Sequence, residues 1–305
     1  MRIATRGSRL AIWQAEHVAK LLSQVAAVDI ELVRVTSSGD RDQTRPVAQL
    51  ESQGLFTKEI QQAVLDGRAD FAVHSLKDLP TEATPELILA AVPERESVND
   101  VLISRDGMGL SQLPRGARVG TGSRRRRAQL LHVRPDLELL DLRGNVETRL
   151  QKLHDGQFEA IVLASAGLKR LGLASEVTEE LMPEAMLPAV GQGALGIEAR
   201  TDDLGTQELL ARIDHAPSRA AVTAERTLLA ELCGGCLAPV GAWAQLDDSR
   251  RLVLDAVVLS LDGRQRLHAT GTDSLEQADA LGRRVAADLL SQGAAELIAA
   301  SRDAK

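Results

Sequence analysis

Two short segments of the sequence contain residues that could do acid–base and covalent chemistry. Asp78 follows Lys77 directly after the apolar stretch Phe71–Val73, which places a carboxylate beside an ammonium group at the end of a predicted strand. Cys236 lies on a glycine-rich turn within the sequence Cys233-Gly-Gly-Cys236. A partly desolvated carboxylate can donate a proton, and a thiolate can bond covalently to an electrophile. The two segments together indicate an enzyme that holds a covalently attached group.

Each segment also has a simpler interpretation. A Lys-Asp pair is often a solvated strand end, and His74 just before it could be structural. The two cysteines could instead form a redox pair or half of a zinc site, although no second CxxC or nearby His pair supplies the other zinc ligands. A dithiol oxidoreductase normally has its CxxC at a helix start, whereas Pro239–Trp243 predicts a loop entering a strand. The oxidoreductase hypothesis predicts that Cys233 and Cys236 act together and that Asp78 is dispensable.

Arginines that follow two predicted turns form another candidate site. The run Arg124–Arg127 begins a predicted helix, and Arg143 and Arg149 flank a second helix start. The helix dipole disfavours cations at this end unless an anion is bound there, and guanidinium groups bind carboxylates bidentately. A solvated helix face is the alternative. The pattern favours a small ligand that carries several carboxylates.

The overall charge of the chain argues against a nucleic-acid-binding function for this site. The chain has 305 residues and a net charge of −7, but residues 115–170 contain 12 Lys or Arg against 6 Asp or Glu. The acidic remainder argues against a general nucleic-acid binder, and an aromatic content of 2% argues against recognition by stacking. No apolar stretch is long enough to span a membrane, and no export signal is recognisable. We expect a cytoplasmic protein with no nucleic-acid or membrane partner and no metal.

Internal echoes in the sequence predict two similar α/β lobes. Strand-like Arg2–Thr5 leads into a turn and a helix capped by Ser8, with Leu10, Trp13, Val18 and Leu21 near one face, and residues 118–131 repeat this order. Residues 66–77 resemble residues 155–169, each being a turn, a buried strand and a loop that ends in Leu-Lys. Doubly wound sheets of this kind bind ligands at the carboxyl ends of their strands, here in the crevice between the lobes.

Two Gly- and Pro-containing stretches, residues 93–97 and 187–193, predict crossings between the lobes. The glycines of residues 191–196 lack the preceding strand of a nucleotide-binding loop, which favours a hinge. The predicted domains are therefore a discontinuous lobe 1 (1–94 and 195–213), lobe 2 (99–188) and a third α/β domain (216–305). The third domain is predicted to have a helix near 219–232, strands near 251–260 and 266–270, and a long helix from about residue 275.

Taken jointly, these motifs resemble the porphobilinogen deaminase (hydroxymethylbilane synthase) family over essentially the whole chain. The segments that carry the resemblance are residues 2–6, 54–59, 74–80, 142–150, 166–172, 188–193 and 235–241. The resemblance implies an α/β fold with two periplasmic-binding-protein-like, doubly wound lobes and a smaller third α/β domain with an antiparallel sheet. It also implies a monomeric transferase of tetrapyrrole and heme biosynthesis. Such an enzyme deaminates four porphobilinogen molecules and joins them head to tail into hydroxymethylbilane, releasing ammonia.

The resemblance also implies roles for individual residues. The motif Gly-Gly-Cys-x-x-Pro implies that Cys236 carries a dipyrromethane primer in thioether linkage, and Asp78 matches the catalytic acid/base that also stabilises the cationic pyrrole. The residues that would clamp the acid side chains of cofactor and substrate are Arg6, Ser8, Lys77, Thr121, Ser123, Arg125, Arg126, Arg143, Arg149 and Arg170. Gln53 and Gly122 depart from the family pattern, where Lys and Ser are common. A two-lobed solute-binding or sensor protein is the competing hypothesis, but it lacks a third domain with a cysteine loop.

Overall fold

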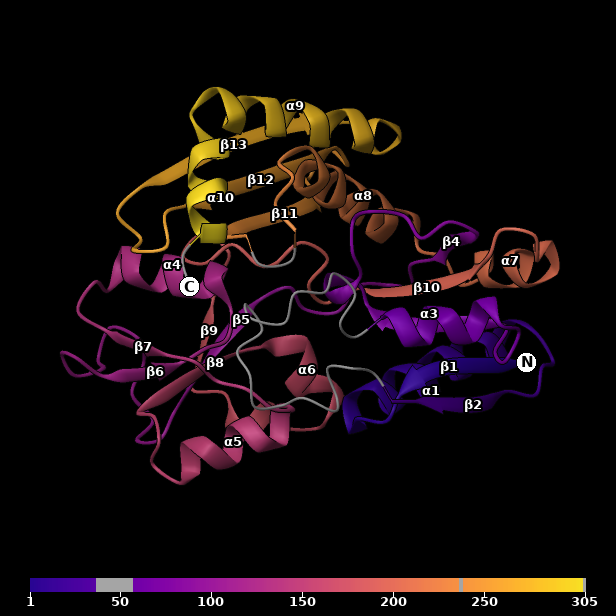
Figure 1. The fold of residues 1–305 in the computed structure, drawn as a ribbon, viewed down its shortest axis with the longest axis horizontal. Helices are drawn as coiled ribbons and strands as arrows, with labels where there is room; N and C mark the ends of the chain where they lie inside the picture. Colours follow the sequence, from indigo (N-terminus) through magenta and orange to yellow (C-terminus); the bar gives the residue numbers. More distant parts are fainter. Residues whose placement is uncertain (37–56, 236–237, 304–305) are drawn as a thin grey trace.

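The computed structural model describes residues 1–36, 57–235 and 238–303, and three β-sheets organise this part of the chain (Figure 1). Two of the sheets have five strands and mix parallel with antiparallel pairs, and the third has three antiparallel strands. The predicted fold class of two α/β lobes and a smaller domain with an antiparallel sheet is confirmed. Gln53 and Cys236 lie outside the described residues.

Lobe 1 is built on the first five-stranded sheet. Its central strands run in parallel, whereas β10 is antiparallel to both of its neighbours. The strands in spatial order are β2 (Glu31–Val35), β1 (Arg2–Arg6), β3 (Phe71–Ser75), β10 (Leu195–Arg200) and β4 (Leu87–Ala91). The helices of this lobe are α1 (Arg9–Val25), α3 (Lys58–Leu65) and α7 (Leu204–Ala211).

Helix α1 begins where the sequence predicts but packs on a different face. The Ser8 hydroxyl accepts a hydrogen bond from the Ala11 amide at 3.3 Å, which confirms the predicted cap. Of the residues predicted to share one face, Val18 is buried, whereas Leu10, Trp13 and Leu21 are only partly buried. The buried apolar face consists of Ala11, Ala15, Val18 and Leu22. The prediction was wrong because it gave weight to large side chains, whereas small alanines let the helix approach its sheet closely.

Lobe 2 repeats the strand arrangement of lobe 1. Its strands in spatial order are β7 (Glu138–Leu140), β6 (Arg118–Gly120), β8 (Ala160–Ala164), β5 (Asp100–Ser104) and β9 (Glu179–Leu181). Here β5 is antiparallel to both neighbours, as β10 is in lobe 1. The helices are α4 (Arg124–Val133), α5 (Val146–His154) and α6 (Ser165–Arg170). Each antiparallel strand is the first strand of its sheet after the chain has crossed from the other lobe.

The repeated sequence segments occupy equivalent positions in the two lobes. Asp66 is the C-cap of α3 and Asp155 is the C-cap of α5. Each is followed by a glycine with positive φ, +69° at Gly67 and +76° at Gly156. The strands that follow, β3 and β8, occupy the same position in their sheets. Ser123 caps α4 through the Arg126 amide, as Ser8 caps α1. The repeat therefore places loops from both lobes at corresponding sheet edges.

The third domain packs on lobe 2 and is connected to both crossings. Its sheet consists of β11 (Val240–Leu246), β12 (Leu252–Leu259) and β13 (Arg266–Asp273), with helices α8 (Ala216–Glu231), α9 (Ala278–Ser291) and α10 (Ala294–Asp303). Figure 1 shows α10 beside α4, where Arg124 donates a hydrogen bond to the Ser301 carbonyl. The three sheets lie within residues 1–94 with 195–213, 99–188 and 216–305, and we retain these ranges as the proposed domains.

A buried ion pair joins the first crossing to the third domain. Arg95 donates to both carboxylate oxygens of Glu225 on α8, at 2.7 and 3.0 Å, and the Glu225 side chain is completely buried. The same carboxylate accepts hydrogen bonds from the amides of Gly191 and Ala244. Because Gly191 belongs to the second crossing and Ala244 to β11, one carboxylate fixes both crossings relative to the third domain.

Candidate functional site

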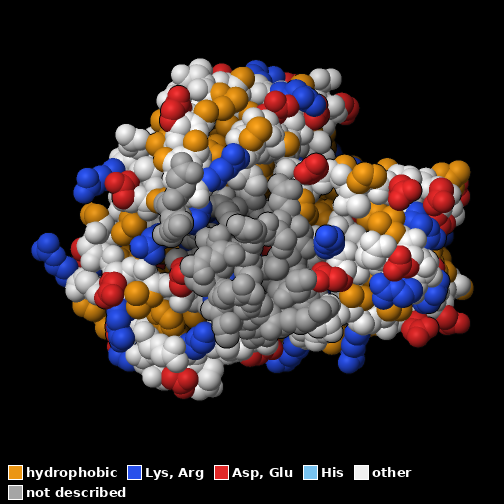
Figure 2. Space-filling model, in the orientation of Figure 1, with side chains coloured by type: hydrophobic (Ala, Val, Ile, Leu, Met, Phe, Trp, Pro, Cys, Tyr) orange, Lys and Arg blue, Asp and Glu red, His pale blue; other side chains and the backbone are white. Residues whose placement is uncertain are grey.

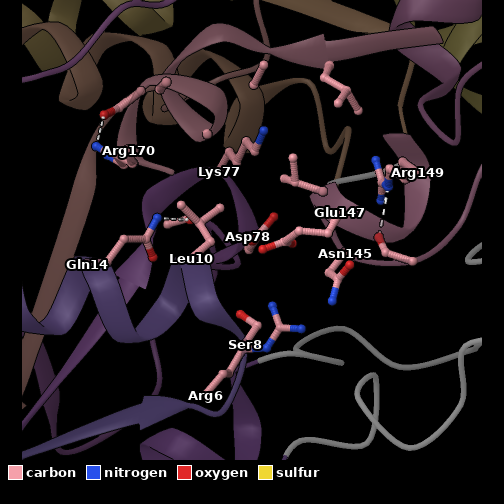
Figure 3. Close-up of a pocket in the computed structure, with 18 of the residues that line it drawn as sticks. Arg6, Ser8, Leu10, Gln14, Lys77, Asp78, Asn145, Glu147, Arg149 and Arg170 are labelled. Carbon is pink, nitrogen blue, oxygen red and sulfur yellow. Dashed lines mark hydrogen bonds between the residues drawn. The ribbon is translucent and has the colours of Figure 1, made fainter. Parts of the chain in front are cut away.

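A cavity of about 500 Å³ is lined by side chains from both lobes (Figure 3). Lobe 1 contributes the ends of β1 and β3 and one face of α1, and lobe 2 contributes the loop before α5, the helix α5 and the helix α6. The lining also includes Thr36 after β2, Arg126 of α4, the end of β8, Gly193 of the second crossing and Ala194 after it. The predicted crevice between two α/β lobes is thus present in the structure.

The lobe 1 side of the cavity is set by the carboxyl ends of two parallel strands. Strand β1 ends at Arg6, and β3 leads into a single 3₁₀ turn, Leu76–Asp78. Leu76 is buried and anchors this turn, so Lys77 and Asp78 lie at the cavity. Adjacent parallel strands end at the same edge of a sheet, which explains why segments 65 residues apart in the sequence contribute to one site.

The lobe 2 side of the cavity is built from a capped helix start and a helix end. The Asn145 side chain caps α5 by accepting from the Thr148 amide at 2.8 Å, and Gly144 before it has φ of +113°. Arg149 Nε donates to the Gly144 carbonyl at 2.8 Å, which orients this guanidinium at the cavity wall. Arg170, the last residue of α6, donates to the Gly193 carbonyl at 2.7 Å. Both arginines are therefore held by main-chain oxygens.

Asp100 forms buried ion pairs with two of the predicted arginines, Arg125 and Arg126. Its side chain is completely buried, with Oδ1 2.7 Å from Arg126 Nη2 and Oδ2 2.7 Å from Arg125 Nη1. Burial alone would raise the pKa of Asp100, but the two guanidinium groups lower it well below its usual range. Asp100 is therefore ionised and lets two buried cations lie side by side. Arg126 reaches the cavity lining, whereas Arg125 lies behind it and donates to the Leu187 carbonyl.

The same network extends to Lys77 through Gln192. The Gln192 amide donates to Asp100 Oδ1 at 2.9 Å, and its carbonyl oxygen accepts from Lys77 Nζ at 3.3 Å. Burial, followed by the charge of Arg126, lowers the pKa of Lys77 from 10.5 to about 8, although Asp78 and Asp100 act in the opposite direction. Lys77 is therefore mainly protonated at neutral pH and loses its charge in mildly alkaline solution.

The described lining of the cavity is strongly cationic in a chain that is acidic overall. Its charged side chains are Arg6, Lys77, Arg126, Arg143, Arg149 and Arg170, against Asp78 and Glu147. On the face shown in Figure 2, by contrast, Lys and Arg are mixed with Asp and Glu over the described part of the surface. Guanidinium groups held in this way suit a ligand with several carboxylates.

The structure brings together most of the residues that the sequence singled out. Arg6, Ser8, Lys77, Asp78, Arg126, Arg143, Arg149 and Arg170 line the cavity. Thr121, Ser123 and Arg125 are not among the described lining residues: Thr121 is buried, Ser123 caps α4 and Arg125 pairs with Asp100. Cys236 is not described, but its neighbour Gly235 has φ of +62° and Cys233 is exposed. The ligand roles of all these residues stay predictions.

Sequence reasoning did not find three residues that organise the site. Asp100 and Gln192 lie far from their partners in the chain, and Gln192 belongs to a segment that the sequence indicated only as a hinge. Gln14, which donates to the Ser75 hydroxyl at 2.8 Å, lies on a helix predicted only as core packing. Gln14 could have been found from its position one turn after Leu10 on the helix that begins at the predicted strand edge, whereas the pairings of Asp100 and Gln192 have no local signal.

The described residues contain neither a metal-ligand cluster nor a membrane-spanning helix. No group of three or more His, Cys, Asp or Glu side chains there is arranged to hold a metal ion. No helix in residues 1–36, 57–235 and 238–303 combines the length and the apolar character needed to cross a membrane.

Comparison with known proteins identifies the family. Residues 1–208 match the family model "Porphobilinogen deaminase, dipyromethane cofactor binding domain", and residues 219–291 match "Porphobilinogen deaminase, C-terminal domain". The chain belongs to the porphobilinogen deaminase family. Porphobilinogen deaminase of Desulforudis audaxviator is 50% identical over 98% of this chain and 97% of its own length. The deaminase of Nitratidesulfovibrio vulgaris, strain Miyazaki F, is 48% identical over 97% of this chain and 95% of its own length.

Solved structures with a similar backbone are more distant. The VFT2 domain of Bordetella pertussis BvgS is 15% identical with a TM-score of 0.42, covering 70% of this chain and 85% of that domain. A periplasmic substrate-binding protein of an ABC transporter from Coxiella burnetii is 13% identical with a TM-score of 0.44, covering 74% of this chain and 96% of its own.

Membership of the porphobilinogen deaminases sets aside the solute-binding and thiol oxidoreductase hypotheses. It makes the chain an enzyme with porphobilinogen deaminase activity and a domain that binds a dipyrromethane cofactor. The cationic lining fits that group, because the acid arms of pyrrole ligands require positive partners. Arg126, Arg143, Arg149 and Arg170 are the lobe 2 cations of this lining that are predicted to hold it.

The lowered pKa of Lys77 predicts a pH dependence of substrate binding in this deaminase. As the pH rises through about 8, Lys77 loses its proton and with it its attraction for carboxylates. We expect KM for porphobilinogen to rise over this range in the wild-type protein. Lys77→Arg keeps its charge and should give a KM that stays level with pH. The measurement is KM across an alkaline pH series, and parallel profiles for the two proteins would contradict the assignment.

Proposed function

We propose that this deaminase joins four porphobilinogen molecules head to tail on a dipyrromethane primer in thioether linkage to Cys236 and then releases hydroxymethylbilane by hydrolysis. The observation that carries the proposal is the position of Asp78, a carboxylate in a cavity whose other described charged residues are six cations and Glu147. Cationic side chains bind the acid arms of the ligands, which leaves Asp78 available for the reacting groups. The proposal also includes a monomeric enzyme in the cytoplasm.

The reaction requires an acid and then a base at one place. Porphobilinogen is a pyrrole with an acetate arm, a propionate arm and an aminomethyl group. Its methylene C–N bond breaks when the nitrogen takes up a proton and leaves as ammonia. A C–C bond then forms between that methylene carbon and the free α-carbon of the growing chain, and this carbon loses its proton. The two proton transfers balance, so one carboxyl group can serve both steps.

Asp78 is the residue proposed for both proton transfers. As an acid it donates a proton to the departing nitrogen, and as a carboxylate it takes the proton that the α-carbon loses. Between these steps the substrate pyrrole is a cation, and the negative Asp78 stabilises it by accepting a hydrogen bond from the ring N–H. Leu76, the first residue of the 3₁₀ turn that contains Asp78, is buried and anchors this turn at the cavity.

The basic residues position the acid arms of the ligands. Arg149 from lobe 2 lies across the cavity from Arg6 and Lys77 of lobe 1 (Figure 3), and Arg143 lines the same cavity, so a ligand bound by both sets is oriented over Asp78. Holding reacting groups in this way supplies much of the rate of a bimolecular step.

Cys236 is the proposed attachment point for the primer. When bound, dipyrromethane supplies the terminal pyrrole carbon to which the first substrate unit is joined. A thiolate suits the attachment because sulfur is nucleophilic towards the electrophilic methylene carbon. Gly235 has a positive φ that permits the tight turn before Cys236. A covalent anchor keeps successive intermediates on the enzyme.

Removing the proton-transfer group tests the role of Asp78. Asp78→Asn keeps the size of the side chain but removes its acid and its negative charge. We expect this variant to fold and to carry the cofactor but to lose turnover by about 10²-fold or more. The measurement is steady-state formation of the tetrapyrrole, with the far-UV spectrum and cofactor content as controls. An unchanged rate would remove Asp78 from the mechanism.

A matched pair of cysteine variants tests the attachment point. Cys236→Ser should abolish activity because the primer has no anchor, whereas Cys233→Ser should leave activity largely intact, since Cys233 is exposed at the end of α8. The measurement is deaminase activity of both purified proteins. Equal loss in the two variants would instead favour a pair of cysteines acting together.

A further inference from the structure

An aromatic stack on α1 lies outside the chemistry described above. Trp13 and His17 are one helical turn apart, and their rings are stacked with centroids 5.0 Å apart and an interplanar angle of 9°. Both side chains are only partly buried, and neither belongs to the face of α1 that packs on the lobe 1 sheet. The packing of α1 on its own sheet therefore does not explain why these two rings are stacked.

The stack contacts a cavity residue of the other lobe. The guanidinium carbon of Arg170 lies 5.8 Å from the centroid of the Trp13 ring, within the range of a cation–π interaction. Arg170 also donates to the Gly193 carbonyl in the second crossing and lines the cavity. One guanidinium thus contacts lobe 1 through Trp13, the crossing through Gly193 and the cavity directly.

The surrounding packing makes this a junction between lobes. Helix α1 packs against α6, and a Cβ atom at Gly167 of α6 would lie 3.7 Å from the Leu10 side chain. Nearby, Arg9 Nη1 of α1 lies 3.6 Å from Glu147 Oε1 of α5, but the Arg9 side chain is 66% exposed and the Glu147 side chain 36%. The Trp13–Arg170 contact is the better shielded of the two, so it is the better candidate for holding the lobes in register.

The charges around His17 make the stack sensitive to pH. Burial, then Arg170 and Lys20, lower the pKa of His17 below 6.5, while Glu96 opposes them. Glu96 is itself 3.8 Å from Lys169. Burial lowers the pKa of Arg170 to about 10, so this side chain remains a cation at neutral pH. A neutral imidazole can stack beside that cation, whereas a protonated one would repel it.

We propose that Trp13 and His17 form a stacked platform that positions Arg170 in the cavity across the two lobes, and that protonation of His17 repels Arg170 from this platform and weakens substrate binding. Trp13 and His17 are positioning residues, because they act through Arg170. The inference rests on the proposed function in one respect, since it takes the cavity as the site where the acidic substrate binds. The pH effect has a definite sign: the contact of Arg170 with the platform is intact above pH 6.5 and is lost as the pH falls through the pKa of His17, which lies below 6.5.

A tryptophan fluorescence titration tests the platform without using activity. The chain has two Trp residues, so Trp243→Phe leaves Trp13 as the only emitter. A protonated imidazole quenches a stacked indole more strongly than a neutral one. We expect Trp13 emission to fall as the pH is lowered from about 8 to about 5, with a midpoint below 6.5. Adding His17→Phe, which keeps a stacking ring but cannot titrate, should abolish this transition, and a transition that survives would overturn the proposal.

Steady-state kinetics test whether the platform acts on the substrate. In the wild-type protein KM for porphobilinogen should rise about threefold to tenfold over the same acid range, with a smaller change in kcat. His17→Phe should remove this rise. The matched control is His268→Gln, an exposed histidine of the third domain that pairs with Asp255, and it should keep the rise. A rise of equal size in His17→Phe and wild type would contradict the positioning role.

A graded series at Trp13 separates the cation–π contact from simple packing. Phe keeps a weaker π face, whereas Leu keeps apolar volume without one. At neutral pH we expect KM to increase in the order wild type, Trp13→Phe, Trp13→Leu, by about threefold to tenfold overall, while cofactor loading is retained. Equal values for Phe and Leu, or no change in either, would overturn the inference. An inactive wild-type protein without a cofactor adduct would instead count against the proposed function, and the fluorescence titration would still report on the platform.

Discussion

The ionised Asp100 carboxylate is the interaction on which the rest of the site depends. Two guanidinium groups, Arg125 and Arg126, are buried side by side, and without a counter-charge their desolvation and mutual repulsion would be strongly unfavourable. Asp100 bridges both of them and also accepts a hydrogen bond from Gln192, which in turn binds Lys77. One buried anion in lobe 2 therefore makes it possible to place cations from both lobes around Asp78.

The repeated architecture explains why the cavity receives its residues from so many parts of the chain. Both sheets have the same strand order, and each presents turn-to-helix starts at the edge that faces the other lobe. The second crossing adds Gly193 to the wall and contains Gln192, which binds Lys77, and Glu225 fixes both crossings to the third domain. Movement of one lobe relative to the other would therefore change contacts at Lys77 and Arg170 together. Binding and lobe position are coupled through the same side chains.

The sequence predicted what depends on local pattern and missed what depends on distant pairing. The caps Ser8 and Ser123, the strand before Asp78 and the repeated turns before β3 and β8 were all recognisable, because each is defined within a few neighbouring residues. The run at residues 124–127 was ambiguous between a solvated face and a ligand site. Its two central members are instead buried against Asp100, about 25 residues away, and no periodicity or composition reveals such a partner. The contact between Trp13 and Arg170 was missed for the same reason.

The third domain contains Cys236, the proposed point of covalent attachment for the primer. Cys236 lies in the sequence between α8, which contains Glu225, and β11, whose Ala244 amide donates to the Glu225 carboxylate, so both flanking elements are tied to the crossings. The most direct test of this account is the intact mass of the freshly purified, active protein, followed by mapping of the modified peptide. We expect a mass greater than that of the polypeptide by two pyrrole units, with the addition on Cys236. Active protein with the mass of the bare polypeptide would contradict the account.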